Sequence, residues 1–218
     1  MLNKTKGRKL YIIILLIGNL IGIILSLVES DSLIQSISYF TWQSNVFVLL
    51  FFSYLLFKNK ELSIKEQSVK AAVTIAILLT FIVYHTLLDP FFNPSEYTPP
   101  FWRNFLVHTY TPLLVLLDYF LFDKKGKLQY RMVPHWLTMP FAYFIYANIY
   151  AILGGTFVFE DSVSRYPYFF MNPDKIGWGF VIIFVLVISL FISTLSILFV
   201  FLDKKIVEEK KYHDREVS

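Results

Sequence analysis

Two short polar patterns in an otherwise apolar sequence could carry out chemistry. Thr41, Ser44 and Asn45 follow one another at spacings of three and one residues, which places them on one face of a helix. In a later apolar stretch, Asn104 and His108 share a face at a spacing of four. A threonine hydroxyl becomes a nucleophile when a neighbouring base takes its proton, and neutral histidine suits that role. These residue types predict a threonine–histidine hydrolytic pair, Thr41 with His108.

Asn45, Asn104 or a tyrosine could support this pair by holding the oxyanion or by orienting His108. Simpler interpretations of the polar residues stay open at this point. Thr41 and Ser44 could bond to carbonyls one turn earlier, and Asn45 could hold two helices together. Tyr143 and Tyr146 share a face of a later helix, where they could pack or could donate to an oxyanion.

A second outer-side pair consists of His85 and Asp89, four residues apart and just before a proline. Together with His108 they could bind a metal, but no longer ligand pattern accompanies them. We therefore expect an outer-side polar pair, and neither a metal site nor a cofactor.

Three further residues are expected to have roles other than that of the Thr41–His108 pair. Asp118 lies ten residues after His108, or about 15 Å further along a helix, too far to orient the imidazole. We expect Asp118 to pair with a lysine of a nearby connecting segment. Pro112 should bend the helix and free a carbonyl close to His108. His135 should be structural or solvated.

The composition places these residues in a membrane. Of the 218 residues, 56% are hydrophobic and only 17% are charged. A soluble domain carries about 25% charged residues, so an ordinary soluble enzyme is excluded, as is a disordered chain. The absence of cysteine excludes disulfides, thiolate zinc sites and cysteine nucleophiles. The net charge of +4 comes from short basic blocks between apolar runs, which indicates membrane topology and not nucleic-acid binding.

Six apolar stretches are long enough to cross a membrane as helices. We predict an all-α integral membrane protein with one domain over residues 1–218. Seventeen of the twenty lysines and arginines lie in alternate connecting segments, which predicts a multi-pass cell-membrane protein with both termini in the cytoplasm. The spans are expected at 10–28, 37–57, 70–88, 101–122, 134–153 and 177–202.

This orientation puts Thr41 and His108 at similar depth in the outer half of the bilayer. A pair at that depth would be reached laterally from lipid, so an amphiphilic ester is the natural substrate. The longest outer segment, 154–176, could form an ordered cap or an aromatic belt at the level of the headgroups.

Five short motifs resemble a known family, the androgen-induced and androgen-dependent membrane hydrolases, and most closely its bacterial six-span branch. The resemblance implies that Thr41 is a nucleophile with His108 as its base. It also implies that fatty acid esters of hydroxy fatty acids, or similar esters, are substrates. One departure is that the proline after the histidine falls one residue earlier here, at Pro112. The motifs are YFTWQSN (39–45), RNFLVHTYTPLLVLLDYFLF (103–122), MPFAYFIY (139–146), YPYFF (166–170) and IGWG (176–179).

Three alternatives to an ester hydrolase remain at this point. The chain could be a non-catalytic protein that binds lipid, or a transporter of small solutes. It could also be a membrane hydrolase that depends on a metal held by His85, Asp89 and His108.

Overall fold

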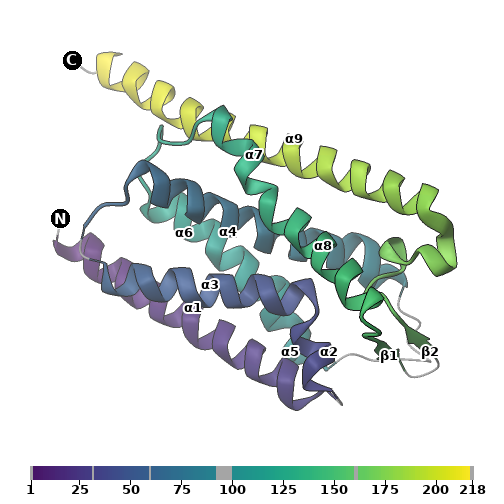
Figure 1. Cartoon of the computed structure of the whole chain (residues 1–218). Helices are drawn as coiled ribbons and strands as arrows, with labels where there is room; N and C mark the ends of the chain where they lie inside the picture. The colour runs from purple at the N-terminus through teal and green to yellow at the C-terminus, as the bar shows by residue number, and fades with distance from the viewer. Residues whose placement is uncertain (1, 31, 59, 92–99, 160–161, 217–218) are drawn as a thin grey trace.

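The helices run back and forth between two ends of an elongated bundle (Figure 1). The computed structural model describes residues 2–30, 32–58, 60–91, 100–159 and 162–216. Helix α1 (Leu2–Val28) begins, and helix α9 (Pro173–Glu216) ends, at the same end of the bundle, here called the terminal end. The opposite end carries a small hairpin of β1 (Phe157–Phe159) and β2 (Ser162–Ser164), and is called the hairpin end.

Between these elements the chain is almost entirely helical, and several helices contain short irregular turns. The turns η1 and η3 are π-helical, whereas η2, η4 and η5 are 3₁₀ turns. In chain order the elements are α2 (Leu33–Ile37), α3 (Phe40–Phe57), α4 (Ile64–Val83), η1 (Tyr84–Leu88), η2 (Asp89–Phe91), α5 (Phe101–Phe105), η3 (Leu106–Tyr110), α6 (Thr111–Phe122), η4 (Tyr130–Met132), α7 (Val133–Trp136), α8 (Thr138–Ile152) and η5 (Phe169–Met171).

Five helical segments in the described part of the chain are long and apolar enough to cross a membrane. They coincide with five of the six predicted spans, so the prediction of a helical, membrane-embedded protein is confirmed. The segments are Lys6–Val28, Phe40–Phe57, Ile64–Leu88, Phe101–Phe122 and Pro173–Glu209.

The remaining predicted span, 134–153, is the fifth in chain order, and it is helical but interrupted. It comprises α7 and the 15 residues of α8, which are separated at Leu137. Pro140 has no N–H to offer the Trp136 carbonyl, and its ring crowds that carbonyl, so a continuous helix is disfavoured at this point. Figure 1 shows α7 and α8 following one another from the terminal end to the hairpin end.

Helix α4 forms the centre of the bundle, and every residue from Lys70 to Thr80 is buried. On one side, Val73 and Ile77 pack in an apolar cluster with α1, α3 and α6. On the other side, Ile75 and Leu79 pack in a second cluster with α7, α8 and α9. Helix α9 keeps a long row of exposed apolar side chains on its outer face, as expected for a helix in contact with lipid.

Two glycines bring α1 close to the π turn η3. A Cβ atom on Gly18 would lie 2.2 Å from the Tyr110 ring, and one on Gly22 would lie 2.9 Å from Val107. A glycine pair at a spacing of four is a common device for close helix packing in membranes. The pair Gly18 and Gly22 therefore lets α1 support the turn that carries His108.

The segment after α8, at the hairpin end, is an ordered cap in the residues described. Its hairpin pairs Phe157 with Ser164. The cap docks onto α2 because the Val158 N–H donates to Gln35 Oε1 (2.9 Å) and Gln35 Nε2 donates to the Val158 carbonyl (3.0 Å). The sequence left two interpretations of residues 154–176 open, an ordered cap and an aromatic belt. The described residues of this segment agree with the ordered cap.

Candidate active site

Two π-helical turns each carry a histidine. His85 lies in η1 and His108 lies in η3. In such a turn the backbone bond reaches five residues back, as it does from the Asp89 N–H to Tyr84 and from the Thr111 N–H to Leu106. Isolated π turns inside α-helices occur frequently at functional sites. The two turns lie against each other, since His85 of η1 bonds to Thr109 of η3.

The turn η3 leaves one backbone carbonyl free, and Asn45 satisfies it. The Thr111 N–H is committed to Leu106, and Pro112 has no N–H, so neither can serve the Val107 carbonyl. Asn45 Nδ2 donates to that carbonyl (3.2 Å) and to the Thr41 carbonyl (2.8 Å). The expected free carbonyl near His108 is therefore that of Val107, and Asn45 ties α3 to η3.

A third helix joins this arrangement through a residue that the sequence interpretation missed. Asn19 of α1 donates from Nδ2 to Asn45 Oδ1 at 2.9 Å, and both side chains are fully buried. An amide inside an apolar span is costly unless it has a partner, so Asn19 could have been noticed from its type and position alone.

The predicted pair meets at this junction. Thr41 Oγ1 lies 3.2 Å from His108 Nε2, which is hydrogen-bonding distance. The Tyr84 ring stacks on the imidazole with centroids 3.8 Å apart and an angle of 11° between the planes. The position of the His108 imidazole is therefore fixed by η3, and the plane of its ring is fixed by stacking on Tyr84 of η1.

The second imidazole nitrogen has different surroundings. His108 Nδ1 is buried and makes no hydrogen bond of normal geometry within the described residues, although the Asn104 backbone lies near the ring. A neutral imidazole that accepts a proton at Nε2 carries its own proton at Nδ1. Asn104, predicted as a supporting residue, thus approaches His108 through its backbone, one turn earlier on the same helix.

The prediction that His85 pairs with Asp89 is wrong for the described structure. Tyr84 donates to Asp89 Oδ1 (3.1 Å), and His85 Nε2 bonds to Thr109 Oγ1 (3.0 Å). The physical reason is the π turn, which aligns residues five apart and so turns Tyr84, and not His85, toward Asp89. Within the described ranges, no three histidine or acidic side chains lie close enough together to hold a metal ion.

Thr41 also faces a cavity that is lined mainly by apolar side chains. About 830 Å³ of space there, open mouth included, is not filled by protein atoms. The lining residues come from α3, α4, η1, α8, α9 and the cap, and the polar side chains among them are Thr41, Thr80, Tyr84, Tyr143, Tyr168 and Ser189.

The other predicted supporting residues position the start of α3. Ser44 Oγ bonds to Thr80 Oγ1 (2.8 Å), which joins α3 to α4. Tyr143 donates to the Ser38 carbonyl (3.0 Å), and the Tyr146 hydroxyl bonds to Ser38 Oγ (2.8 Å). None of these three side chains has His108 as a hydrogen-bond partner, so their observed contacts are with the framework around Thr41.

Tyr168 of the cap is a residue that sequence reasoning did not single out. Its side chain lines the cavity, and its hydroxyl lies against the Thr41 side chain and the backbone of Phe40 and Thr41. Burial raises the pKa of this phenol, whereas the contacts with Thr41 and Phe40 act in the opposite direction. A tyrosine in an irregular loop has no periodicity that would reveal where its side chain points.

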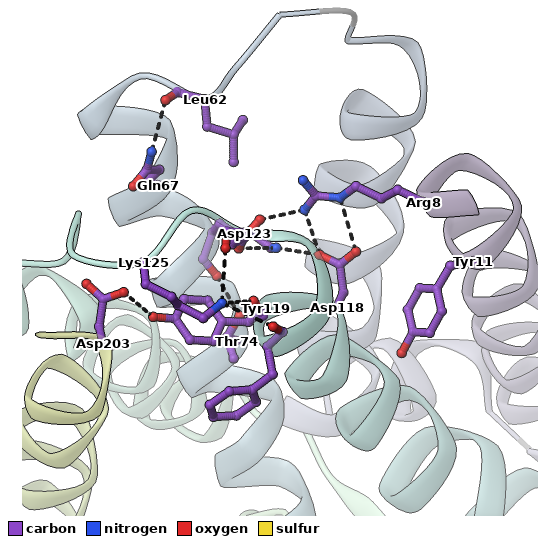
Figure 2. A network of polar contacts seen from close by, with 12 residues as sticks. Arg8, Tyr11, Leu62, Gln67, Thr74, Asp118, Tyr119, Asp123, Lys125 and Asp203 are labelled. Carbon is purple, nitrogen blue, oxygen red and sulfur yellow. Dashed lines mark hydrogen bonds and ion pairs between the residues drawn. The ribbon is translucent and has the colours of Figure 1, made fainter. Parts of the chain in front are cut away.

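Asp118 lies in a separate polar network at the terminal end (Figure 2). It forms ion pairs with Arg8 (2.8 Å) and with Lys70. Asp123 binds the same two cations, with 2.6 Å to Arg8. Asp118 pairs with a lysine as predicted, but Lys70 lies within α4 and not in a connecting segment, and Arg8 is an additional partner.

Next to these ion pairs, Asp203 of α9 accepts hydrogen bonds from the Tyr119 hydroxyl (2.5 Å) and from the Gly126 and Leu128 N–H groups (2.9 and 2.8 Å). The network therefore fastens α1, α4, α6 and α9 together, as Figure 2 shows for several of its members. It involves neither Thr41 nor His108.

Comparisons with known proteins found no match among protein-family models, curated proteins or solved structures.

Proposed function

We propose that the protein is an intramembrane threonine hydrolase of lipid esters, with Thr41 as nucleophile and His108 as general base. The observation that carries this proposal is the 3.2 Å separation of Thr41 Oγ1 and His108 Nε2 beside a largely apolar cavity. The motif resemblance to the androgen-induced and androgen-dependent hydrolases supports the same two assignments. The chemistry requires no metal or cofactor.

The reaction follows from the positions of the two side chains. As Thr41 Oγ forms a bond to the ester carbonyl carbon, its proton passes to His108 Nε2. The carbonyl electron pair moves to oxygen, and the tetrahedral intermediate then collapses. The alcohol leaves with the proton from His108, and an acyl-threonine remains. Water, deprotonated by His108, then releases the fatty acid and restores Thr41.

The proposed topology has six crossings with both termini in the cytoplasm of a cell-membrane protein, and the fifth crossing is formed by α7 and α8. Support comes from the basic residues, since seventeen of twenty belong to segments at the terminal end. Such segments face the cytoplasm in multi-pass proteins. The reactive pair then lies in the outer half of the bilayer.

The proposed substrate is an amphiphilic ester that enters from the lipid. The cavity wall includes Phe141 of α8, which is 53% exposed, and Ile188 and Ser189 of α9. Helix α9 packs against α7 toward the terminal end and against η5 toward the hairpin end, with the cavity lining between these contacts. An acyl chain suits such a wall. Fatty acid esters of hydroxy fatty acids, or similar esters, fit this description.

The proposal is tested by turnover of the purified protein in detergent or liposomes. A branched fatty acid ester and an aryl ester of a fatty acid serve as substrates. We expect Thr41→Ala and His108→Ala each to lose about three orders of magnitude or more in kcat, because nucleophile and base act as a unit. Folding is checked by thermal unfolding of each variant.

Matched controls separate the pair from other threonines and histidines. Thr86 and His135 are both exposed and lie outside the cavity lining, so Thr86→Ala and His135→Ala should keep wild-type turnover. Full activity in a folded Thr41→Ala variant would refute the nucleophile. Tight binding of the ester without any turnover by the wild type would instead identify a non-catalytic lipid-binding protein.

A further inference from the structure

The Tyr168 side chain is held in place at the cavity by other aromatic rings. Its ring stacks on Phe170 with centroids 5.3 Å apart and 3° between the planes. Tyr39 and Tyr143 flank it at 6.1 and 6.3 Å. Contacts of this kind orient a phenol without using its hydroxyl. The hydroxyl itself has polar neighbours, which are the Tyr143 hydroxyl and the first turn of α3.

That hydroxyl lies where other donors converge beside the nucleophile. It meets the Thr41 side chain and the backbone of Phe40 and Thr41, in the first turn of α3. The first N–H groups of a helix have no acceptor within the helix, and Tyr39 at the N-cap makes no side-chain capping bond to them. A developing negative charge at this position would be favoured by these N–H groups and by the helix dipole.

The other polar side chains of the cavity lining are already engaged or lie elsewhere. The Tyr143 hydroxyl bonds to Ser38, the Tyr84 hydroxyl to Asp89, and the Thr80 hydroxyl to Ser44. Ser189 comes from α9, across the cavity from the first turn of α3. His108 Nε2 lies within hydrogen-bonding distance of Thr41 Oγ1 and is placed to accept its proton.

We infer that Tyr168 is the oxyanion donor, contributing its phenolic hydrogen together with the N–H groups at the start of α3. This inference rests on the proposed function. When Thr41 Oγ bonds to the carbonyl carbon, the carbonyl oxygen gains the electron pair and accepts from the Tyr168 O–H and the α3 amides. When the alcohol leaves, the electron pair returns to form the ester carbonyl of the acyl-threonine.

The protonation state suits a donor. An ordinary tyrosine has a pKa near 10, and burial raises the pKa of Tyr168 further. The phenol therefore keeps its hydrogen throughout the neutral range, which an oxyanion donor must do.

The test compares Tyr168→Phe with wild type on the same fatty-acyl aryl ester. The variant keeps the ring contacts and removes only the hydroxyl. We expect kcat to fall by about 10²–10³, the usual effect of losing one oxyanion donor, while KM changes by less than about threefold. Tyr150→Phe is the matched control, because among the described residues its hydroxyl bonds only to the Thr156 carbonyl, at 3.4 Å, and Tyr150 does not line the cavity.

A second readout separates oxyanion binding from a structural role. An alkyl trifluoromethyl ketone forms a reversible hemiketal with the threonine oxygen, whose former carbonyl oxygen carries the negative charge. Its Ki should rise in Tyr168→Phe by about the same factor as kcat/KM falls, because it resembles the transition state. Unchanged kcat and Ki, with wild-type turnover intact, would overturn the role of Tyr168 alone. Absence of turnover in the wild type would overturn the proposed function, and this inference with it.

Discussion

The two polar regions of this bundle differ in how completely their groups are satisfied. At the terminal end, Asp118 and Asp123 share Arg8 and Lys70, so two anions neutralise two cations. Toward the hairpin end, the groups around Thr41 are uncharged, and buried His108 Nδ1 makes no hydrogen bond of normal geometry within the described residues.

This difference separates polar groups that stabilise the fold from polar groups that can take part in a reaction. Buried charges are tolerated when each one is paired, and a fully paired cluster has no remaining capacity for a substrate. A neutral hydroxyl and imidazole can be buried at lower cost, and they can still exchange a proton. The terminal network is therefore expected to control stability, and the Thr41 region to control chemistry.

The largest stability effect is expected from Asp118→Ala. The change leaves Arg8 and Lys70 facing Asp123 alone, and breaking a buried ion pair in this way costs about 3–5 kcal/mol. Thermal or denaturant unfolding in detergent should show the loss, while KM of the molecules that remain folded should be unchanged.

A compensated variant sharpens this prediction. Combining Lys70→Met with Asp118→Leu leaves Arg8 and Asp123 as a balanced pair at 2.6 Å, so most of the lost stability should return. Disrupting the exposed Arg165–Asp174 pair with Asp174→Asn should change little, since such pairs are screened by water. A stable Asp118→Ala variant with impaired turnover would reverse the assignment of the two regions.

A smaller, mixed effect is expected from Asn45→Ala. It leaves the Val107 carbonyl and the Asn19 amide without their partner, which should cost about 1–2 kcal/mol in a membrane protein. It should also lower kcat, because the π turn that carries His108 loses the hydrogen bond that ties its Val107 carbonyl to α3. Both unfolding and turnover are measured.

Asn148→Ala is the matched control for that change, since its amide bonds only to the Phe144 carbonyl one turn earlier on α8. An Asn45→Ala variant that keeps both stability and kcat would show that the amide network does not position the base.

Several of these features could be predicted from the sequence, because the number of residues between two positions on a regular helix gives their difference in depth along the bundle. The register of two apolar stretches put Thr41 and His108 at one level, and they lie 3.2 Å apart. The same helical spacing placed Asp118 too far from His108 to orient its imidazole. Pairing of Asp118 with a lysine followed from the cost of burying a lone charge.

The features that the sequence did not reveal depend on departures from regular geometry or on loops. The π turns changed the partner of Asp89 from His85 to Tyr84, since a spacing of four was assumed where five applies. Tyr168 reaches the first turn of α3 from an irregular cap whose path has no periodic signal. The interruption at Leu137 has a signal in Pro140, but its consequence for the fifth span depends on packing.

The most direct test of the threonine–histidine pair is covalent labelling. The purified protein is treated with an alkyl fluorophosphonate, whose fluoride is displaced by an activated hydroxyl, and the modified peptide is sequenced by mass spectrometry. We expect a single adduct on Thr41 that is lost in His108→Ala and retained in His135→Ala. Ester turnover with no adduct on Thr41, or with the adduct on Ser44 instead, would contradict the assignment of Thr41 as the nucleophile.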